Sequence, residues 1–87
     1  MLRSHQPKIF KKWHTKLPIK IKQKFEEKLK LFLTNSFDRT LNNHPLHGEY
    51  DGCNSINVTG DYRAIYFMDG DIAVFIRIGT HSELFGK

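Results

Sequence analysis

The chain has 87 residues, a formal net charge of +5 at pH 7 and one cysteine, Cys53. This length allows one domain, expected over residues 1–87, with a modest hydrophobic core. A single cysteine excludes an internal disulfide framework and a thiolate metal cluster, which suits a reducing cytoplasm. No apolar run approaches the roughly 18 residues of a membrane span, so we expect a soluble cytoplasmic protein without membrane contact.

The charge is unevenly distributed along the chain. Residues 1–43 hold eleven Lys and Arg against three acidic residues, whereas residues 44–87 hold three against six. A basic half beside a more neutral, aromatic-rich half suits a polyanionic partner such as nucleic acid, or an acidic protein. The alternative is that the lysines are only the solvated face of a helix, and charge alone does not separate the two.

Two basic amphipathic segments predict helices in the first half of the chain. One covers residues 8–16 and the other runs from Pro18, at a tolerated first-turn position, to about Asn35. In the second segment apolar side chains recur at spacings of three and four, namely Ile21, Phe25, Leu29 and Phe32 or Leu33. The short connection predicts an αα-hairpin, and residues 1–6 leave room for a short edge strand.

After a polar stretch the apolar period changes to two, which predicts strands over residues 56–58, 62–68 and 72–78. Asp69-Gly70 is a strong hairpin signal, and Thr59-Gly60 is a weaker one. Helices followed by an antiparallel meander predict an α+β fold. The αα-hairpin should pack on one face of a three- to five-stranded, mainly antiparallel sheet.

Two-residue loops at these turns predict a register for the sheet. Met68 would lie opposite Asp71, Tyr62 opposite Arg77 and Asn57 opposite Tyr62. Asn57, Tyr62 and Arg77 would then form one row across three strands. The face expected under the helices carries Ile65, Phe67, Ile72, Val74 and Ile76. The opposite face would carry Tyr62, Ala64, Tyr66, Ala73, Phe75 and Arg77. A slip of one residue at the weaker turn would move Asn57 to the core side.

Residues with acid, base and phosphate-binding chemistry gather around the C-terminal end of this predicted sheet. Thr80 and Glu83 have capping-box spacing, which predicts a helical turn that brings His81 and Phe85 back towards Arg77. The nearby turns and loops add Asp61, Tyr62, His44 and His47. Such a group can cleave RNA without metal, because a base can deprotonate the ribose 2′-hydroxyl, an arginine can stabilise the phosphorane and an acid can protonate the leaving oxygen. Aromatic rings can stack on the bases.

Each of these residues also has a simpler interpretation. Arg77 could form a surface salt bridge, His81 could be an exposed turn residue, and Phe85 could only anchor the chain end to the core. His47 is more simply solvated than catalytic, and Asp61 beside a glycine is a standard turn residue. The two loop histidines stand three positions apart without a companion ligand, so neither a metal nor another cofactor is expected.

Three motifs occur in order over about residues 41–87: H-P-L-x-G, a G-D-Y-R turn, and R-x-G-T-H-x-x-L-F. Together they resemble the RelE/ParE toxin superfamily, and most closely its YafQ-like branch of bacterial mRNA interferases. The lysine-rich helix matches more loosely. The resemblance implies a type II toxin, an endoribonuclease that cleaves mRNA on the ribosome and is neutralised by a cognate antitoxin. Contacts with ribosomal RNA would then fall on the basic helices.

Carried over by position, the resemblance places functional residues at His44, Asp61, Arg77, His81 and Phe85. The chain departs from the family pattern twice, with Asn57 where a second histidine is expected and Tyr62 where a tryptophan is expected. An asparagine can hydrogen-bond a phosphate but cannot transfer a proton. The resemblance therefore implies substrate-binding roles for Asn57, Tyr62 and Phe85, and either a weaker enzyme or a base role for His44 and Asp61.

Two other functions remain open from the sequence. One is a non-enzymatic ParE-like toxin of the same fold that inhibits a target such as gyrase by binding. The joint presence of His44, His81 and Arg77 argues against it, because a pure binder needs no acid and base beside a phosphate. The other is a nucleic-acid-binding accessory protein that uses only its basic helices.

Overall fold

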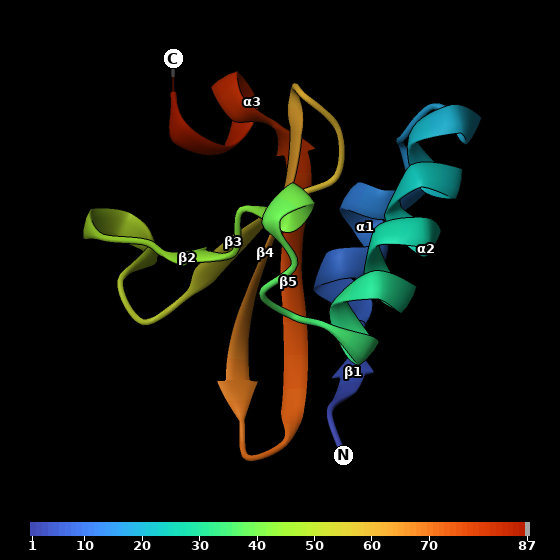
Figure 1. Cartoon of the computed structure of the whole chain (residues 1–87). Helices are drawn as coiled ribbons and strands as arrows, with labels where there is room; N and C mark the ends of the chain where they lie inside the picture. Colours follow the sequence, from blue (N-terminus) through green and yellow to red (C-terminus); the bar gives the residue numbers. More distant parts are fainter. Residues whose placement is uncertain (87) are drawn as a thin grey trace.

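The computed structural model describes residues 1–86, which form a five-stranded sheet with two longer helices beside it (Figure 1). The strands are β1 (Arg3–His5), β2 (His44–Pro45), β3 (Asn54–Asn57), β4 (Tyr62–Asp69) and β5 (Ile72–Thr80). Their order across the sheet is β1-β5-β4-β3-β2. β1 pairs with β5 in parallel, and the other neighbours are antiparallel. The predicted α+β class is confirmed.

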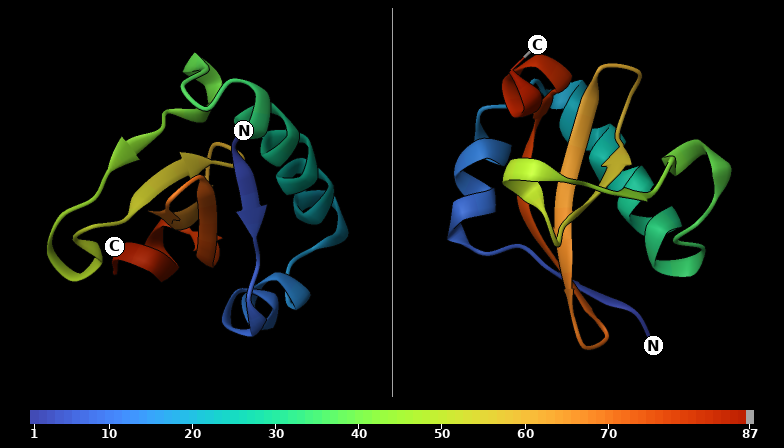
Figure 2. Two further views of the ribbon diagram at one scale, coloured as in Figure 1. Left: turned by 90° about the horizontal axis from the view of Figure 1, so that it is seen from below. Right: turned by 90° about the vertical axis from the view of Figure 1, so that its left-hand side faces the viewer.

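The helices α1 (Lys8–Thr15) and α2 (Ile19–Thr34) form the predicted αα-hairpin. Pro18 directly precedes Ile19, the first residue of α2. The shorter elements are the 3-10 turns η1 (Arg39–Leu41) and η2 (Gly48–Tyr50) and the helix α3 (His81–Phe85). The views in Figure 2 place α1 and α2 on one side of the β4–β5 hairpin and the β2–β3 segment with α3 on the other. Within residues 1–86, no helix is long and apolar enough to cross a membrane.

Aromatic rings fill the core between the helices and the sheet. Phe10, Phe25 and Phe32 lie 6.0, 5.7 and 5.6 Å from Phe75 between ring centroids, all edge to face. This geometry contributes about 0.5–1.5 kcal/mol per pair beyond the burial of area. Tyr66 joins the cluster, and its burial raises the pKa of its hydroxyl. That hydroxyl is satisfied by a hydrogen bond to Asn43.

The helices cover the face of the sheet opposite to the one predicted. The buried residues under them include Ala64, Tyr66, Ala73 and Phe75, whereas Phe67 is 36% exposed on the other face. The predicted core face of Ile65, Phe67, Ile72, Val74 and Ile76 is therefore wrong. Both faces are apolar, so a period of two could not choose between them. The choice follows from the helices, whose phenylalanine rings need aromatic partners and the space left by alanines.

The β4–β5 turn is also one residue further along the chain than predicted. Asp69 lies opposite Ile72, so the loop consists of Gly70 and Asp71, and Met68 does not pair with Asp71. Gly70 has a φ of 63°. A type I′ loop at Asp69-Gly70 would need positive φ at both residues, whereas the observed loop confines it to the glycine, as in type II′.

The β3–β4 connection changes the predicted row of site residues. Asn57 lies opposite Arg63 rather than Tyr62, and Tyr62 lies opposite Thr80 rather than Arg77. Tyr62 packs against the core on the helix side of the sheet. The predicted row of Asn57, Tyr62 and Arg77 is therefore wrong. The β3–β4 loop is longer than two residues and shifts the pairing of β3 with β4 by one position, and the later β4–β5 turn together with the extra residue Ile76 shifts the pairing of β4 with β5.

His14, on α1, packs against two rings of the core, which also contact each other. Its centroid is 5.9 Å from those of Phe10 and Phe25. Burial lowers the pKa of His14, Lys22 lowers it further and Glu26 opposes them. The folded state thus binds this proton less tightly than the unfolded chain. The contribution of neutral His14 to stability is complete above the unfolded pKa of about 6.5 and is lost as the pH falls towards the folded value.

We expect this histidine to make thermal stability depend on pH below neutrality. The melting temperature should fall as the pH is lowered from about 7 to 5, and His14→Phe should remove part of that fall because its ring cannot take up a proton. Thermal unfolding followed by circular dichroism at both pH values measures the effect. The exposed His5 supplies the control, since His5→Gln should leave the pH dependence unchanged. Identical pH dependence in wild type and His14→Phe would contradict the prediction.

Candidate functional site

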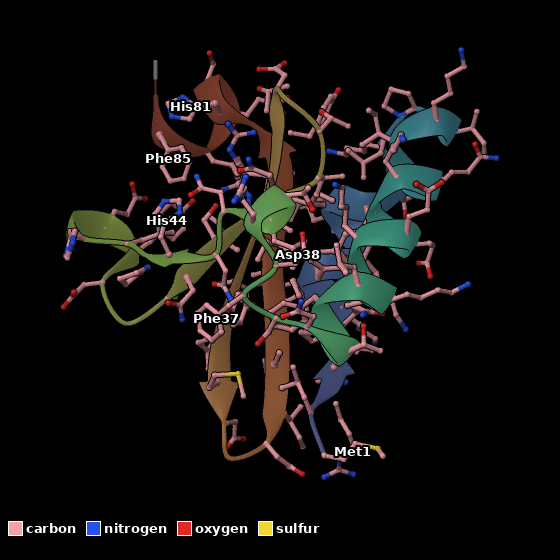
Figure 3. The ribbon with its side chains drawn as sticks, viewed as in Figure 1. Met1, Phe37, Asp38, His44, His81 and Phe85 are labelled. Carbon is pink, nitrogen blue, oxygen red and sulfur yellow. The ribbon has the colours of Figure 1, made fainter. Side chains whose placement is uncertain are left out.

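A cavity of about 350 Å³ lies on the side of the sheet away from α1 and α2. Its lining comes from β2, β3, β4, α3 and the loops around β2, and comprises Asn42, His44, Leu46, Ser55, Arg63, His81 and Phe85. In Figure 3, His44, Phe85 and His81 follow one another along this side of the molecule. His44, His81 and Phe85, which were all selected from the sequence, thus line one cavity. They come from β2 and α3, which are far apart in the chain.

His44 enters the cavity from β2, opposite Ser55 on β3. Its Nδ1 lies 2.7 Å from the carbonyl oxygen of Asn42. A carbonyl oxygen can only accept, so Nδ1 carries the hydrogen of this bond, and Nε2 is the acceptor atom of the neutral ring. Asn42 holds a left-handed φ of 46°, a conformation that asparagine tolerates better than most residues. The local backbone therefore presents His44 as a base at Nε2.

The predicted capping box is present at the start of α3. The Thr80 hydroxyl accepts a hydrogen bond from the Glu83 backbone N–H at 3.2 Å, and the Glu83 carboxylate accepts one from the Thr80 N–H at 2.8 Å. The backbone N–H of His81 donates to the carbonyl oxygen of Asp61 at 2.9 Å. The His81 ring packs 4.9 Å from that of Phe85. These bonds fix α3 against the β3–β4 turn and bring His81 to the cavity.

A β-bulge turns Arg77 to the cavity side of the sheet. Tyr66 lies opposite Phe75 whereas Ile65 lies opposite Arg77, so Ile76 is an extra residue in β5. Without it, Arg77 would share the helix-facing side with Phe75, two positions earlier. The sequence also predicted a common face for these two residues, but on the side away from the helices. Bulges commonly re-aim a side chain in this way.

The guanidinium of Arg77 lies between side chains from two other elements. Its Cζ is 4.0 Å from the ring centroid of Trp13 on α1. Its Nη1 donates to the hydroxyl of Tyr50 on η2 at 3.3 Å, while its Nε is buried and lacks a hydrogen-bond partner within residues 1–86. Tyr50 in turn packs edge to face on Phe85 at 6.0 Å. Arg77 is thus joined to the cavity wall through Tyr50 and Phe85.

The other candidates do not line the cavity, namely Arg77, Asp61, Asn57, Tyr62 and His47. Asn57 lies on the cavity face beside Arg63, and its Oδ1 is buried without a hydrogen-bond partner in the described part of the chain. The same holds for the hydroxyl of Ser55, which is 1% exposed. Tyr62 faces the helices, and His47 is exposed before η2. Among residues 1–86, no three His, Cys, Asp or Glu side chains are grouped as metal ligands would be.

Six residues of this region were not selected from the sequence: Asn42, Leu46, Arg63, Ser55, Trp13 and Tyr50. The Nη1 of Arg63 donates to three carbonyl oxygens of the adjoining turn, those of Thr59, Gly60 and Tyr62. Correct registers would have found Arg63 and Ser55, since both lie in the cavity-facing positions of their strands. Trp13 and Tyr50 are linked to Arg77 only by the packing of distant segments, and their sequence neighbourhoods carry no signal for it.

The chain matches the family model described as the bacterial toxin of type II toxin-antitoxin systems, YafQ, over residues 4–86. It belongs to this toxin family. The match agrees with the resemblance carried by the H-P-L-x-G and R-x-G-T-H-x-x-L-F motifs, and it extends to the basic helices, which the motifs do not cover. A comparison with curated protein sequences gives no match.

Solved structures share the fold of this YafQ-family toxin. The crystal structure of YafQ from E. coli strain BL21(DE3) superposes with a TM-score of 0.74 at 23% identity, covering 99% of this chain and 100% of that one. YafQ in the E. coli DinJ-YafQ toxin-antitoxin complex gives 0.72 at 25% identity, with coverage of 99% and 100%. A conserved hypothetical protein from Helicobacter pylori gives 0.68 at 26% identity, covering 98% and 100%.

Proposed function

We propose that this toxin is a metal-independent endoribonuclease that cleaves mRNA on the ribosome. The observation that carries the proposal is the meeting of two imidazoles, His44 and His81, in the lining of one cavity. The guanidinium of Arg77, on the same side of the sheet, is linked to this lining through Tyr50 and Phe85. Acid–base cleavage of RNA needs two proton-transferring groups on either side of a phosphate and a fixed cation near it. Membership of the YafQ toxin family supports the same reaction.

In this mechanism His44 is the general base. Its Nε2 takes the proton of the ribose 2′-hydroxyl, and the 2′-oxygen attacks the adjacent phosphorus to form a phosphorane. Arg77 stabilises the charge on the phosphorane oxygens. His81 donates its proton to the leaving 5′-oxygen as the phosphorus–oxygen bond breaks. The products are a 2′,3′-cyclic phosphate and a free 5′-hydroxyl, with one proton taken up and one released.

Supporting roles fall to residues around the cavity. Asp61 holds the first residue of α3 through its carbonyl oxygen, and we assign it a role in positioning His81. Phe85, which contacts the rings of His81 and Tyr50, offers a stacking surface for a base. Asn57 offers a neutral hydrogen-bond donor and Arg63 a charged one, and both lie on the same face of the sheet. Tyr62 packs on the opposite side and is given no part in catalysis.

The partners we propose are a cognate antitoxin and the translating ribosome. Eleven of the fourteen Lys and Arg residues lie within residues 1–43, most of them on α1 and α2, and a basic surface of this kind suits ribosomal RNA. The same charge favours fast association with an acidic antitoxin segment. We propose that the antitoxin covers the basic helices and the cavity face, so that it blocks Arg77 or displaces α3. A complex that left both surfaces free would refute this.

Primer extension on a reporter message after induced expression tests the function. We expect discrete cuts within the translated region, with none in a matched message that lacks its start codon. The Arg77→Ala variant serves as the inactive control. Growth arrest without cuts would overturn the proposed function and favour the binding-type toxin instead.

Asn57 provides a gain-of-function prediction. An imidazole at this position of the cavity face can exchange a proton near neutral pH, with a free pKa of about 6.5, whereas the amide cannot. Asn57→His should raise the single-turnover cleavage rate about 3- to 30-fold, since a fully positioned acid or base contributes about 100-fold or more. Asn57→Ala should lower it only mildly. If the histidine variant is no faster and the alanine variant is inactive, Asn57 is instead an essential hydrogen-bonding residue.

A further inference from the structure

The Arg77 side chain is restrained by two groups that lie outside β5. The Trp13 ring covers one face of the guanidinium at 4.0 Å, and the Tyr50 hydroxyl accepts a hydrogen from Nη1. α1 and η2 are distant in sequence, and they meet at this arginine from different sides. Contacts from two elements restrict a long side chain that would otherwise occupy many rotamers.

We propose that Trp13 and Tyr50 are positioning residues for Arg77, and that they hold its guanidinium in place for the phosphate before the substrate binds. This rests on the proposed function, since it assigns both residues to the ribonucleolytic site. A cation fixed in advance stabilises a developing charge more effectively than one that must be ordered during the reaction.

The two contacts leave suitable donors of Arg77 for the substrate. Tyr50 uses Nη1, whereas the Nε–H is buried and has no hydrogen-bond partner among the residues that the structure describes. Nε–H and an Nη2–H share one edge of the guanidinium, which matches two oxygens of a phosphate. A buried donor without a partner is unfavourable in the free protein, and a phosphate oxygen would satisfy it once the groups that cover this edge move aside on substrate binding.

Trp13 has two other roles to be weighed against this one. It lies near Lys12 and Lys16, at 5.7 and 5.4 Å from its ring, but these distances are longer than that to Arg77, and an ammonium cannot stack as a planar guanidinium does. Trp13 also packs against the core. A purely structural role predicts lower stability without a selective effect on the cleavage step.

Single-turnover cleavage of ribosome-bound message separates these roles. Trp13→Ala should lower the maximal rate constant about tenfold or more while the half-saturating ribosome concentration stays within about twofold, and Trp13→Phe, which keeps a ring face, should stay within about threefold of wild type. Tyr50→Phe should cost about threefold. In an Arg77→Lys background, Trp13→Ala should lower the maximal rate constant by less than about a further twofold, because both changes act through the guanidinium of Arg77. Gln23→Ala, which changes an exposed and uncharged residue of α2, is the control and should leave the maximal rate constant unchanged.

Three results would overturn the proposal. The first is a Trp13→Ala rate constant within about twofold of wild type at saturating ribosomes. The second is a change confined to the half-saturating concentration, which would make Trp13 a binding residue. The third is an equal loss from Trp13→Ala in the wild-type and Arg77→Lys backgrounds.

Fluorescence tests the contact without relying on cleavage. Trp13 is the single tryptophan of the chain, so its emission should change with Arg77→Ala and stay the same with Arg39→Ala, which removes an exposed arginine. A toxin that cleaves message but whose emission ignores Arg77 would overturn the positioning role alone. A wild-type protein that does not cleave, while its emission responds to Arg77→Ala, would overturn the proposed function and leave the contact standing.

Discussion

Arg77→Ala is expected to remove most of the mRNA cleavage activity while the toxin stays folded. The bulge at Ile76 aims this guanidinium at the cavity side, where it is the strongest candidate for stabilising the phosphorane. Removing a preorganised donor of this kind costs about 2–4 kcal/mol in the barrier, or about 30- to 1,000-fold in rate. Because Arg77 is only partly buried and contacts Trp13 and Tyr50 at its tip, the loss of stability should be small.

Single-turnover assays on ribosome-bound message and thermal unfolding measure the two parts of this expectation. Arg77→Lys is the informative companion variant, since it keeps the charge but loses the planar fork and the stacking on Trp13. It should retain more activity than Arg77→Ala and much less than wild type. Full cleavage by a folded Arg77→Ala protein would remove Arg77 from the mechanism. If Arg77→Ala does not fold, the role of Arg77 is tested by comparing Arg77→Lys with wild type.

The sequence predicted the elements of the fold well because their signals are local. A period near 3.6 defines α1 and α2, a period of two defines β4 and β5, and the capping box from Thr80 to Glu83 defines α3. Each of these patterns depends on residues within one or two turns of each other. The order of elements then limits the fold to helices packed on one side of an antiparallel sheet.

The sequence could not predict which face of the sheet is buried or how the strands align. Ala64 and Phe75 alternate with equally apolar neighbours, so only packing against the phenylalanines of α1 and α2 decides their side. The extra residue Ile76 leaves no mark in a run of apolar side chains, yet it reverses the side on which Arg77 emerges. Arg77 was assigned to the face away from the helices on a register that is wrong, and the bulge is what places it there.

The residues of the candidate site also differ in whether the sequence could indicate them. His44, His81 and Phe85 were selected because they belong to motifs, and they line one cavity. Trp13 and Tyr50 reach Arg77 through the assembly of segments far apart in the chain, which no local pattern encodes. The motif residues can thus be found in the sequence, whereas the residues that orient them require the three-dimensional packing.

His81→Gln is expected to slow cleavage about 100-fold or more, as the loss of a general acid. Glutamine is close in length and can still donate a hydrogen bond, but it cannot give up a proton to the leaving 5′-oxygen. The capping box and the hydrogen bond from the His81 backbone to Asp61 do not involve the imidazole, so α3 should stay in place. The melting temperature should therefore change little.

The pH dependence of the rate distinguishes an acid from a residue that only packs on Phe85. A general acid must be protonated, so the wild-type rate should fall on the alkaline side of its optimum, and His81→Gln should lose that fall together with most of its activity. His47→Gln is the matched control, because His47 is an exposed histidine outside the cavity lining, and its rate should stay within about twofold of wild type. If His81→Gln keeps both the rate and the alkaline fall, the proton must come from another group. His81 would then serve only to hold Phe85 and α3 beside the cavity.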